Sequence, residues 1–82
     1  MAAEARAMRA VTCPNCRSRS ELEAVDCGEC AACGFEIDAF AQRPDAERAY
    51  RRLRGDVHAI VIAPVLDGHG RWLVAHTRLL LV

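Results

Sequence analysis

The sequence contains no lysine, and all eleven of its basic side chains are arginines. Eleven acidic side chains balance them, so the formal net charge is zero. A neutral chain lacks the excess of basic residues with which nucleic-acid-binding domains attract phosphate. Arginine differs from lysine physically only where it makes a bidentate contact, so we interpret the missing lysine as coding bias.

We expect no secretory signal, and the sequence shows no long apolar run. The first ten residues, MAAEARAMRA, carry charges where a signal peptide would be apolar. The longest apolar run, VHAIVIAPVL at 57–66, is too short to span a bilayer and contains His58 and Pro64. We therefore expect a cytoplasmic protein without a membrane contact. In a reducing compartment, paired cysteines favour a metal site over disulfides.

Five cysteines are present in a chain of only 82 residues. A chain of this length forms one small domain and commonly needs a metal, a disulfide or a partner to be stable. Two C-x-x-C pairs, CPNC at 13–16 and CAAC at 30–33, each allow one tight turn to present two thiolates to the same ion. The remaining cysteine is Cys27.

Two sets of four ligands are consistent with this spacing. One set is Cys13, Cys16, Cys30 and Cys33, and the other is Cys13, Cys16, Cys27 and Cys30. Gly34 favours the first set, because a glycine after the second cysteine lets backbone N–H groups point at sulfur. Cys27 lies in the turn signal DCG, so we predict that it is outside the site. Four thiolates favour zinc over hard cations, and we expect one zinc ion per chain.

The segment CPNCRSRSELEAVDCGECAACGFEID resembles the zinc ribbon of the general transcription factor IIB type, over about residues 11–38. The shared features are a C-P-x-C knuckle, a strand, an acidic turn containing glycine, and C-x-x-C-G before an apolar strand. The segment departs from the family at Arg17, where glycine is usual, and in the additional Cys27. The resemblance implies a β-hairpin with two Cys knuckles and a transcriptional setting. The cyclin-like repeats of the family are missing from the rest of the chain.

A closed site of four cysteines has no open position for chemistry, so we expect the metal to be structural. Iron, as in rubredoxin, is an alternative that the ligands alone do not exclude. Thiol–disulfide chemistry at CPNC is not favoured, because no βαβ pattern surrounds it. We therefore predict a protein that is not an enzyme.

The predicted fold is a small metal-stabilised α+β domain in four segments. These are a flexible N-terminal arm (1–12), the zinc ribbon (13–38), an Arg-rich helix (43–55) and a C-terminal β-hairpin (57–82). In the helix, Pro44 suits the first turn, Gly55 suits the C-terminal cap, and an apolar stripe repeats at helical spacing. Gly68 and Gly70, in DGHG, allow the turn of the hairpin.

Residues 21–38 contain six acidic residues and no basic one. An acidic ribbon repels phosphate, so binding of nucleic acid by the ribbon is not expected. The runner-up function is a nucleic-acid-binding regulator that uses the arginines of the helix. These are Arg48, Arg51, Arg52 and Arg54.

Both faces of the predicted C-terminal hairpin are apolar, and strands of this kind are normally buried on both faces. Either the helix and the ribbon cover one face each, or the hairpin is an interface for a protein partner or a second copy. The leading functional hypothesis is a non-enzymatic zinc-ribbon adaptor, with transcription as the expected setting.

Overall fold

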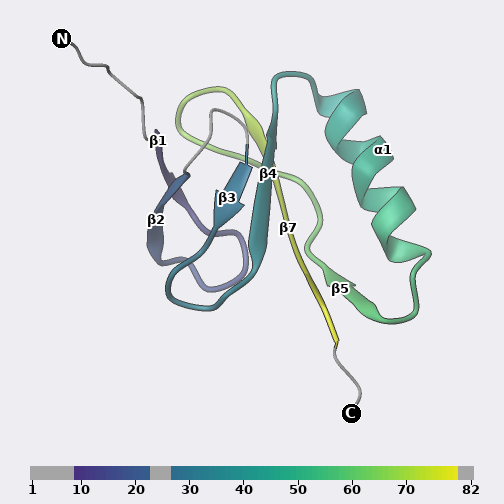
Figure 1. Cartoon of the computed structure of the whole chain (residues 1–82). Helices are drawn as coiled ribbons and strands as arrows, with labels where there is room; N and C mark the ends of the chain where they lie inside the picture. The colour runs from purple at the N-terminus through teal and green to yellow at the C-terminus, as the bar shows by residue number, and fades with distance from the viewer. Residues whose placement is uncertain (1–8, 23–26, 80–82) are drawn as a thin grey trace, which may run out of the picture.

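The computed structural model describes residues 9–22 and 27–79 of the chain, which form seven strands and one helix (Figure 1). In chain order these are β1 (Arg9–Thr12), β2 (Arg19–Leu22), β3 (Cys27–Glu29), β4 (Glu36–Phe40), α1 (Arg43–Arg54), β5 (Ala59–Val61), β6 (Val65–Leu66) and β7 (Trp72–Arg78). The small α+β fold class predicted from the sequence is confirmed. Parts of the predicted arm (1–8), of the ribbon (23–26) and of the hairpin (80–82) lie outside the described residues.

The prediction of a flexible arm up to residue 12 is wrong for its last four residues. Arg9–Thr12 form β1, which pairs antiparallel with β2 from Arg9 opposite Leu22 to Thr12 opposite Arg19. The reason is burial: Val11 and Leu22 both point into the core, with 4% and 0% of their surface exposed. The ribbon therefore begins before its first cysteine, and it consists of two hairpins, β1–β2 and β3–β4.

The second ribbon hairpin and the C-terminal strands belong to one sheet. The sequence analysis treated them as separate segments and did not predict that they pair. β4 pairs antiparallel with β7, Ile37 lying opposite Ala75 and Ala39 opposite Leu73. The sheet has five strands in the order β3-β4-β7-β5, and β6 also pairs with β7. The long strand β7 therefore lies at the centre and connects the ribbon to the C-terminal segment.

The two faces of this sheet are covered by different elements, as Figure 1 shows. Ile37, Ala39, Leu73 and Ala75 share one face by register, and they form a core cluster with Val11 and Leu22 of the first hairpin. The opposite face packs against α1, which contacts β4, β5 and β7. The first ribbon hairpin thus covers one face and the helix covers the other, while five large apolar side chains of residues 57–79 stay exposed.

Helix α1 is close to its predicted span. Pro44 lies in its first turn and Asp45 favours that end, as the sequence indicated. Ala46 and Ala49 of the apolar stripe are buried. Gly55 caps the helix in a right-handed conformation, with φ of −73°, so its freedom to adopt positive φ is not used. No helix among the described residues is long and apolar enough to cross a membrane.

The C-terminal hairpin is interrupted where the sequence has Pro64. The Ile62 N–H donates to the carbonyl of Ala75, whereas Val65 lies opposite Leu73. Two residues, Ala63 and Pro64, therefore stand against Val74 alone, which is a β-bulge. Proline has no N–H for a ladder and is confined to edges and bulges, so it divides the predicted strand into β5 and β6.

The turn between β6 and β7 forms at DGHG as predicted. The Asp67 carboxylate oxygen Oδ1 accepts hydrogen bonds from the backbone N–H groups of His69 and Arg71, both at 2.8 Å. Gly70 adopts φ of 84°, a conformation that favours glycine, whereas Gly68 does not have positive φ.

Candidate metal centre

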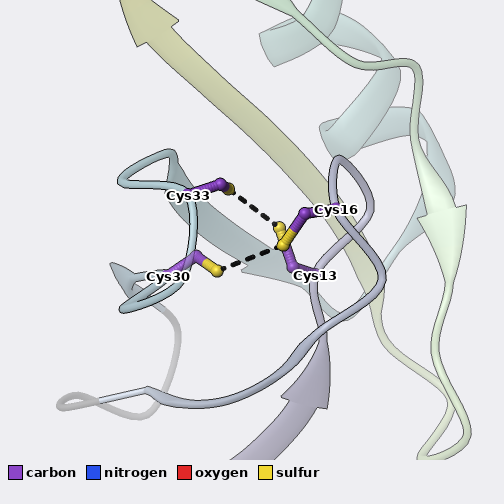
Figure 2. Close-up of side chains that lie close together, drawn as sticks. All are labelled: Cys13, Cys16, Cys30 and Cys33. Atoms are coloured by element: carbon purple, nitrogen blue, oxygen red, sulfur yellow. Dashed lines mark hydrogen bonds between the residues drawn. The ribbon is translucent and has the colours of Figure 1, made fainter.

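The two C-x-x-C turns bring four sulfur atoms together between the ribbon hairpins (Figure 2). The Sγ atoms of Cys13, Cys16, Cys30 and Cys33 all lie within 4.8 Å of one another. Cys13 Sγ is 3.7 Å from Cys33 Sγ, and Cys16 Sγ is 3.6 Å from Cys30 Sγ. A zinc ion with Zn–S bonds of about 2.3 Å requires sulfurs about 3.8 Å apart, so this cluster can hold a tetrahedral metal ion.

These four residues are the first of the two ligand sets considered from the sequence. Cys27, which the second set required, is exposed on β3 opposite Asp38 and does not belong to the cluster. The reason is local geometry. A strand extends through Cys27–Glu29, whereas a tetrahedral site needs the tight turn that begins at Cys30.

Each Cys knuckle, the turn Cys13–Ser18 and the turn Cys30–Phe35, is closed by the same pair of backbone hydrogen bonds. In the first, the Cys13 N–H donates to the Ser18 carbonyl and the Arg17 N–H donates to the Cys13 carbonyl, both at 2.9 Å. In the second, Cys30 pairs with Phe35 and Gly34 with Cys30 in the same way, both at 2.8 Å. The two knuckles therefore present their cysteines with equivalent backbone geometry.

Backbone hydrogen bonds stabilise the thiolates of Cys13 and Cys30, in the knuckle that contains Arg17 as well as in the one that contains Gly34. Burial raises the pKa of the Cys13 thiol to about 12, and hydrogen bonds from the backbone of Cys16 and Asn15 partly oppose that rise. In the second knuckle, the backbone of Cys33 and Ala32 also stabilises the Cys30 thiolate. A metal cation at the centre would favour the thiolate form of every ligand.

Ser20 is a part of the site that the sequence interpretation missed. Its hydroxyl, which can donate to the Cys30 thiolate, is the main reason why the pKa of that thiol falls to about 6. Ser20 is buried, and its Oγ has no hydrogen-bond partner among the described residues, so the hydroxyl is available to the thiolate. Strand alternation with the buried Leu22 is the signal that could have identified an inward serine at this position.

Cys16 and Cys33 are less buried than Cys13 and Cys30, but their side chains also pack against the core. The pKa of Cys16 is lowered, first by the side chain of Ser18 and then by its backbone. The core cluster includes Cys13 and Cys30 together with Val11, Leu22 and Ile37. The metal centre is thus a part of the hydrophobic core, and loss of its geometry would disturb the packing of both hairpins.

Comparisons with protein families, with curated proteins and with solved structures each gave no match to this chain.

Proposed function

We propose that this protein is a non-enzymatic module, stabilised by one zinc ion, that binds another protein or a second copy through residues 57–79. The observation that carries the proposal is the position of the exposed apolar side chains. Every large hydrophobic residue that is exposed among the described residues belongs to this segment. They are Val57, Ile60, Val65, Leu66 and Leu79, with 85%, 42%, 44%, 53% and 45% of their surface exposed. Contiguous exposed apolar groups are typical of binding surfaces, and we propose that side chains of this segment contribute to one.

Zinc is the metal that this ligand set supports best. Four cysteine sulfurs at tetrahedral spacing suit zinc or iron, and a closed set of protein ligands is typical of structural zinc sites. Metal analysis of the purified chain distinguishes the two ions. In zinc-finger peptides, binding contributes about 10–16 kcal/mol of apparent free energy, which would compensate here for a small core.

The surroundings of the other reactive side chains support a role without catalysis. His76 is held by Asp38, with 3.0 Å between Nε2 and Oδ2, and it lies on β7 away from the four sulfurs. His58 and His69 are exposed in turns, where their backbone N–H groups bond to Asp56 and Asp67. The metal ligands leave no open coordination position for a substrate.

Strand β5 offers one means of binding within this segment. It is the last strand in the sheet order, so one of its edges has no partner strand within residues 9–22 and 27–79. The backbone bonds of His58 and Ile62 to β7 show by alternation that Val61 directs its N–H and C=O groups outward. The carbonyl of Ala59 also points outward, whereas its N–H donates to the carbonyl of Asp56 at 3.0 Å. An edge with free backbone groups and exposed apolar side chains is a template for strand addition.

Two further parts of the proposal rest on the sequence. The resemblance of residues 11–38 to the transcription factor IIB type of zinc ribbon suggests an adaptor role in transcription. The five cysteines, free in this structure, suit the reducing environment of the cytoplasm.

The test combines light scattering across a dilution series with capture from native lysate by the zinc-loaded chain. We expect self-association or a retained partner, either of which is lost in Ile60→Ser and kept in the control Ala41→Ser, an exposed site outside the segment. Amide exchange at Val61 should slow on association. A chain that stays monomeric to millimolar concentration and captures no partner would show the proposal to be wrong.

A second candidate function, binding of nucleic acid, is favoured by one observation. Arg51 and Arg52 of α1 are exposed, and neither forms an ion pair within residues 9–22 and 27–79. In contrast, Arg43 pairs with Glu47, and Arg48 pairs with Asp45. Salt separates the two functions, because phosphate contacts weaken steeply with salt concentration and an apolar interface does not.

A further inference from the structure

A groove of about 460 Å³ lies between the first ribbon hairpin and the turn that joins β6 to β7. One wall contains Ala10, Val11 and Thr12 of β1, and the other contains Val65 and Leu66 of β6. The volume is within the range of about 300–1,000 Å³ that is usual for ligand sites. Because both walls are strands, a further strand in the groove could pair with either of them.

Each wall presents an unpaired strand edge. Among the described residues β1 pairs only with β2, and β6 pairs only with β7. The Cys13 N–H bonds to Ser18, which makes Val11 opposite Ser20 a hydrogen-bonded pair by alternation. The backbone groups of Ala10 and Thr12 therefore point away from β2, along the free edge.

The same alternation applies to β6. The Asp67 N–H bonds to the Arg71 carbonyl, so Val65 opposite Leu73 is the next hydrogen-bonded pair. Leu66 lies between these two pairs, and its backbone N–H and C=O point away from β7. An extended peptide in the groove could satisfy donors and acceptors of Ala10 and Thr12 on one side, or of Leu66 on the other.

The charged residues of the groove indicate the chemistry of the peptide. Arg17 and Arg19 both line it, are exposed, and form no ion pair within the described part of the chain. The carboxylate that lines the groove belongs to Asp67, whose Oδ1 already accepts two backbone hydrogen bonds and whose Oδ2 is buried. The available charge is therefore positive, next to the apolar Val65.

We propose that this groove binds an extended, acidic segment of a partner protein by strand addition. Backbone hydrogen bonds to a free edge of β1 or β6 supply affinity, and ion pairs with Arg17 and Arg19 select carboxylates. The inference rests on the proposed function, to which it adds a second contact surface that shares Val65 and Leu66 with residues 57–79 and has a partner of stated chemistry. It differs from association at the β5 edge, which involves Ile60 and Leu79 and does not border this groove.

The experiment uses the zinc-loaded full chain and three synthetic peptides of about eight residues, the length of an ordinary strand. In the first, Glu alternates with Val; in the second, Lys replaces Glu; in the third, the first peptide is N-methylated at alternate backbone nitrogens. We expect the acidic peptide to bind at least about tenfold more tightly than either of the others. The largest amide shifts should occur at Ala10, Thr12 or Leu66.

Variants separate this surface from the rest of the molecule. Arg19→Glu should weaken the acidic peptide about tenfold and strengthen the lysine peptide, whereas the control Arg52→Glu on α1 should change neither. Zinc content and amide dispersion show whether each variant is folded. The comparison of the three peptides uses the unmodified chain, so it tests the proposal even if a variant does not fold. Equal binding of acidic and basic peptides, no binding below millimolar, or shifts confined to β5 would each overturn the proposal.

Two other outcomes distinguish the failures. If the amide shifts of Ala10, Thr12 and Leu66 change with protein concentration in the absence of any peptide, the occupant of the groove is a second copy of this chain. That result would reject a separate partner protein as the occupant. Association that is lost in Ile60→Ser while the groove binds no peptide would leave the proposed function in place and reject this inference alone.

Discussion

Arg17 and Gly34 occupy the same position in the two Cys knuckles, and both adopt a left-handed backbone, with φ of 68° and 82°. Each residue follows the second cysteine of its turn, and each donates its N–H to the carbonyl of the first. Glycine adopts this conformation without steric cost, whereas arginine does not. The first knuckle therefore holds a strained residue where the second holds a relaxed one.

This difference predicts opposite effects of two substitutions on stability. Arg17→Gly should raise the free energy of unfolding by about 1 kcal/mol, and Gly34→Ala should lower it by about 1–2 kcal/mol. A Cβ at Gly34 would meet no atom within 4 Å, so the loss there is backbone strain and not a clash. Denaturant unfolding at a fixed excess of zinc measures both. Destabilisation by Arg17→Gly would show that the arginine side chain makes a compensating contact.

Replacement of a metal ligand should unfold the ribbon. Serine at position 13, 16, 30 or 33 removes one thiolate, and the folding free energy supplied by the metal is lost with it. Cys27→Ser is the matched control, because Cys27 is exposed and outside the cluster. We expect one zinc per chain in Cys27→Ser and close to none in the other four, as measured by metal analysis and amide dispersion. Equal zinc loss in Cys27→Ser and Cys33→Ser would reverse the assignment of the ligands.

Zinc binding to a metal-free chain that is still folded should release fewer protons at neutral pH than binding to an unfolded chain, in which all four thiols are neutral. In the folded metal-free chain the pKa of Cys30 is about 6, so this group is already a thiolate at neutral pH. Its ordinary pKa is 9.0, so its ionisation favours the folded state above pH 9, and this contribution is lost as the pH falls from there through about 6. Calorimetry in buffers of different ionisation enthalpy counts the protons, and the count should rise below pH 6. A full release at neutral pH would mean that the metal-free ribbon is unfolded.

Two leucines of the C-terminal segment should differ strongly in their contribution to stability. Leu73 is 1% exposed in the core, whereas Leu79 is 45% exposed. Leu73→Ala should destabilise the fold by about 2–5 kcal/mol, because it leaves a cavity. Leu79→Ala should lower the free energy of unfolding by much less than this, when it is measured on the monomer at low concentration. A large loss from Leu79→Ala under these conditions would mean that its side chain is buried in solution.

Tight binding to nucleic acid is not expected. The chain has zero net charge, and Glu29 and Glu36 are exposed beside the metal centre. We expect no sub-micromolar affinity for DNA or RNA at physiological salt, measured by anisotropy with labelled duplexes and single strands. Sub-micromolar binding that disappears in the double variant Arg51→Gln, Arg52→Gln would favour the second candidate function instead.

Local chemistry made several features predictable from the sequence. C-x-x-C spacing fixes two sulfurs on one turn, and Gly34 marks the turn that needs positive φ, so the four clustered cysteines could be chosen without a structure. Pro44 and the apolar stripe determined the helix in the same way, because both act within a few residues of the chain. The turn at Asp67–Arg71 follows from an Asp side chain that bonds its own backbone.

Tertiary structure decided the features that depend on residues far apart in the chain. Pairing of β4 with β7 joins segments that the sequence presents as separate, and nothing local to Ile37 specifies Ala75 as its neighbour. Burial against this sheet makes a strand of Arg9–Thr12, although an isolated segment of this length would not hold a fixed structure. The bulge at Ala63 and Pro64 also depends on a distant segment. The missing N–H of Pro64 changes the strand register only because this segment pairs with β7. Short-range rules thus determined the metal site and the helix, whereas long-range burial and strand pairing determined the sheet and its unpaired edges.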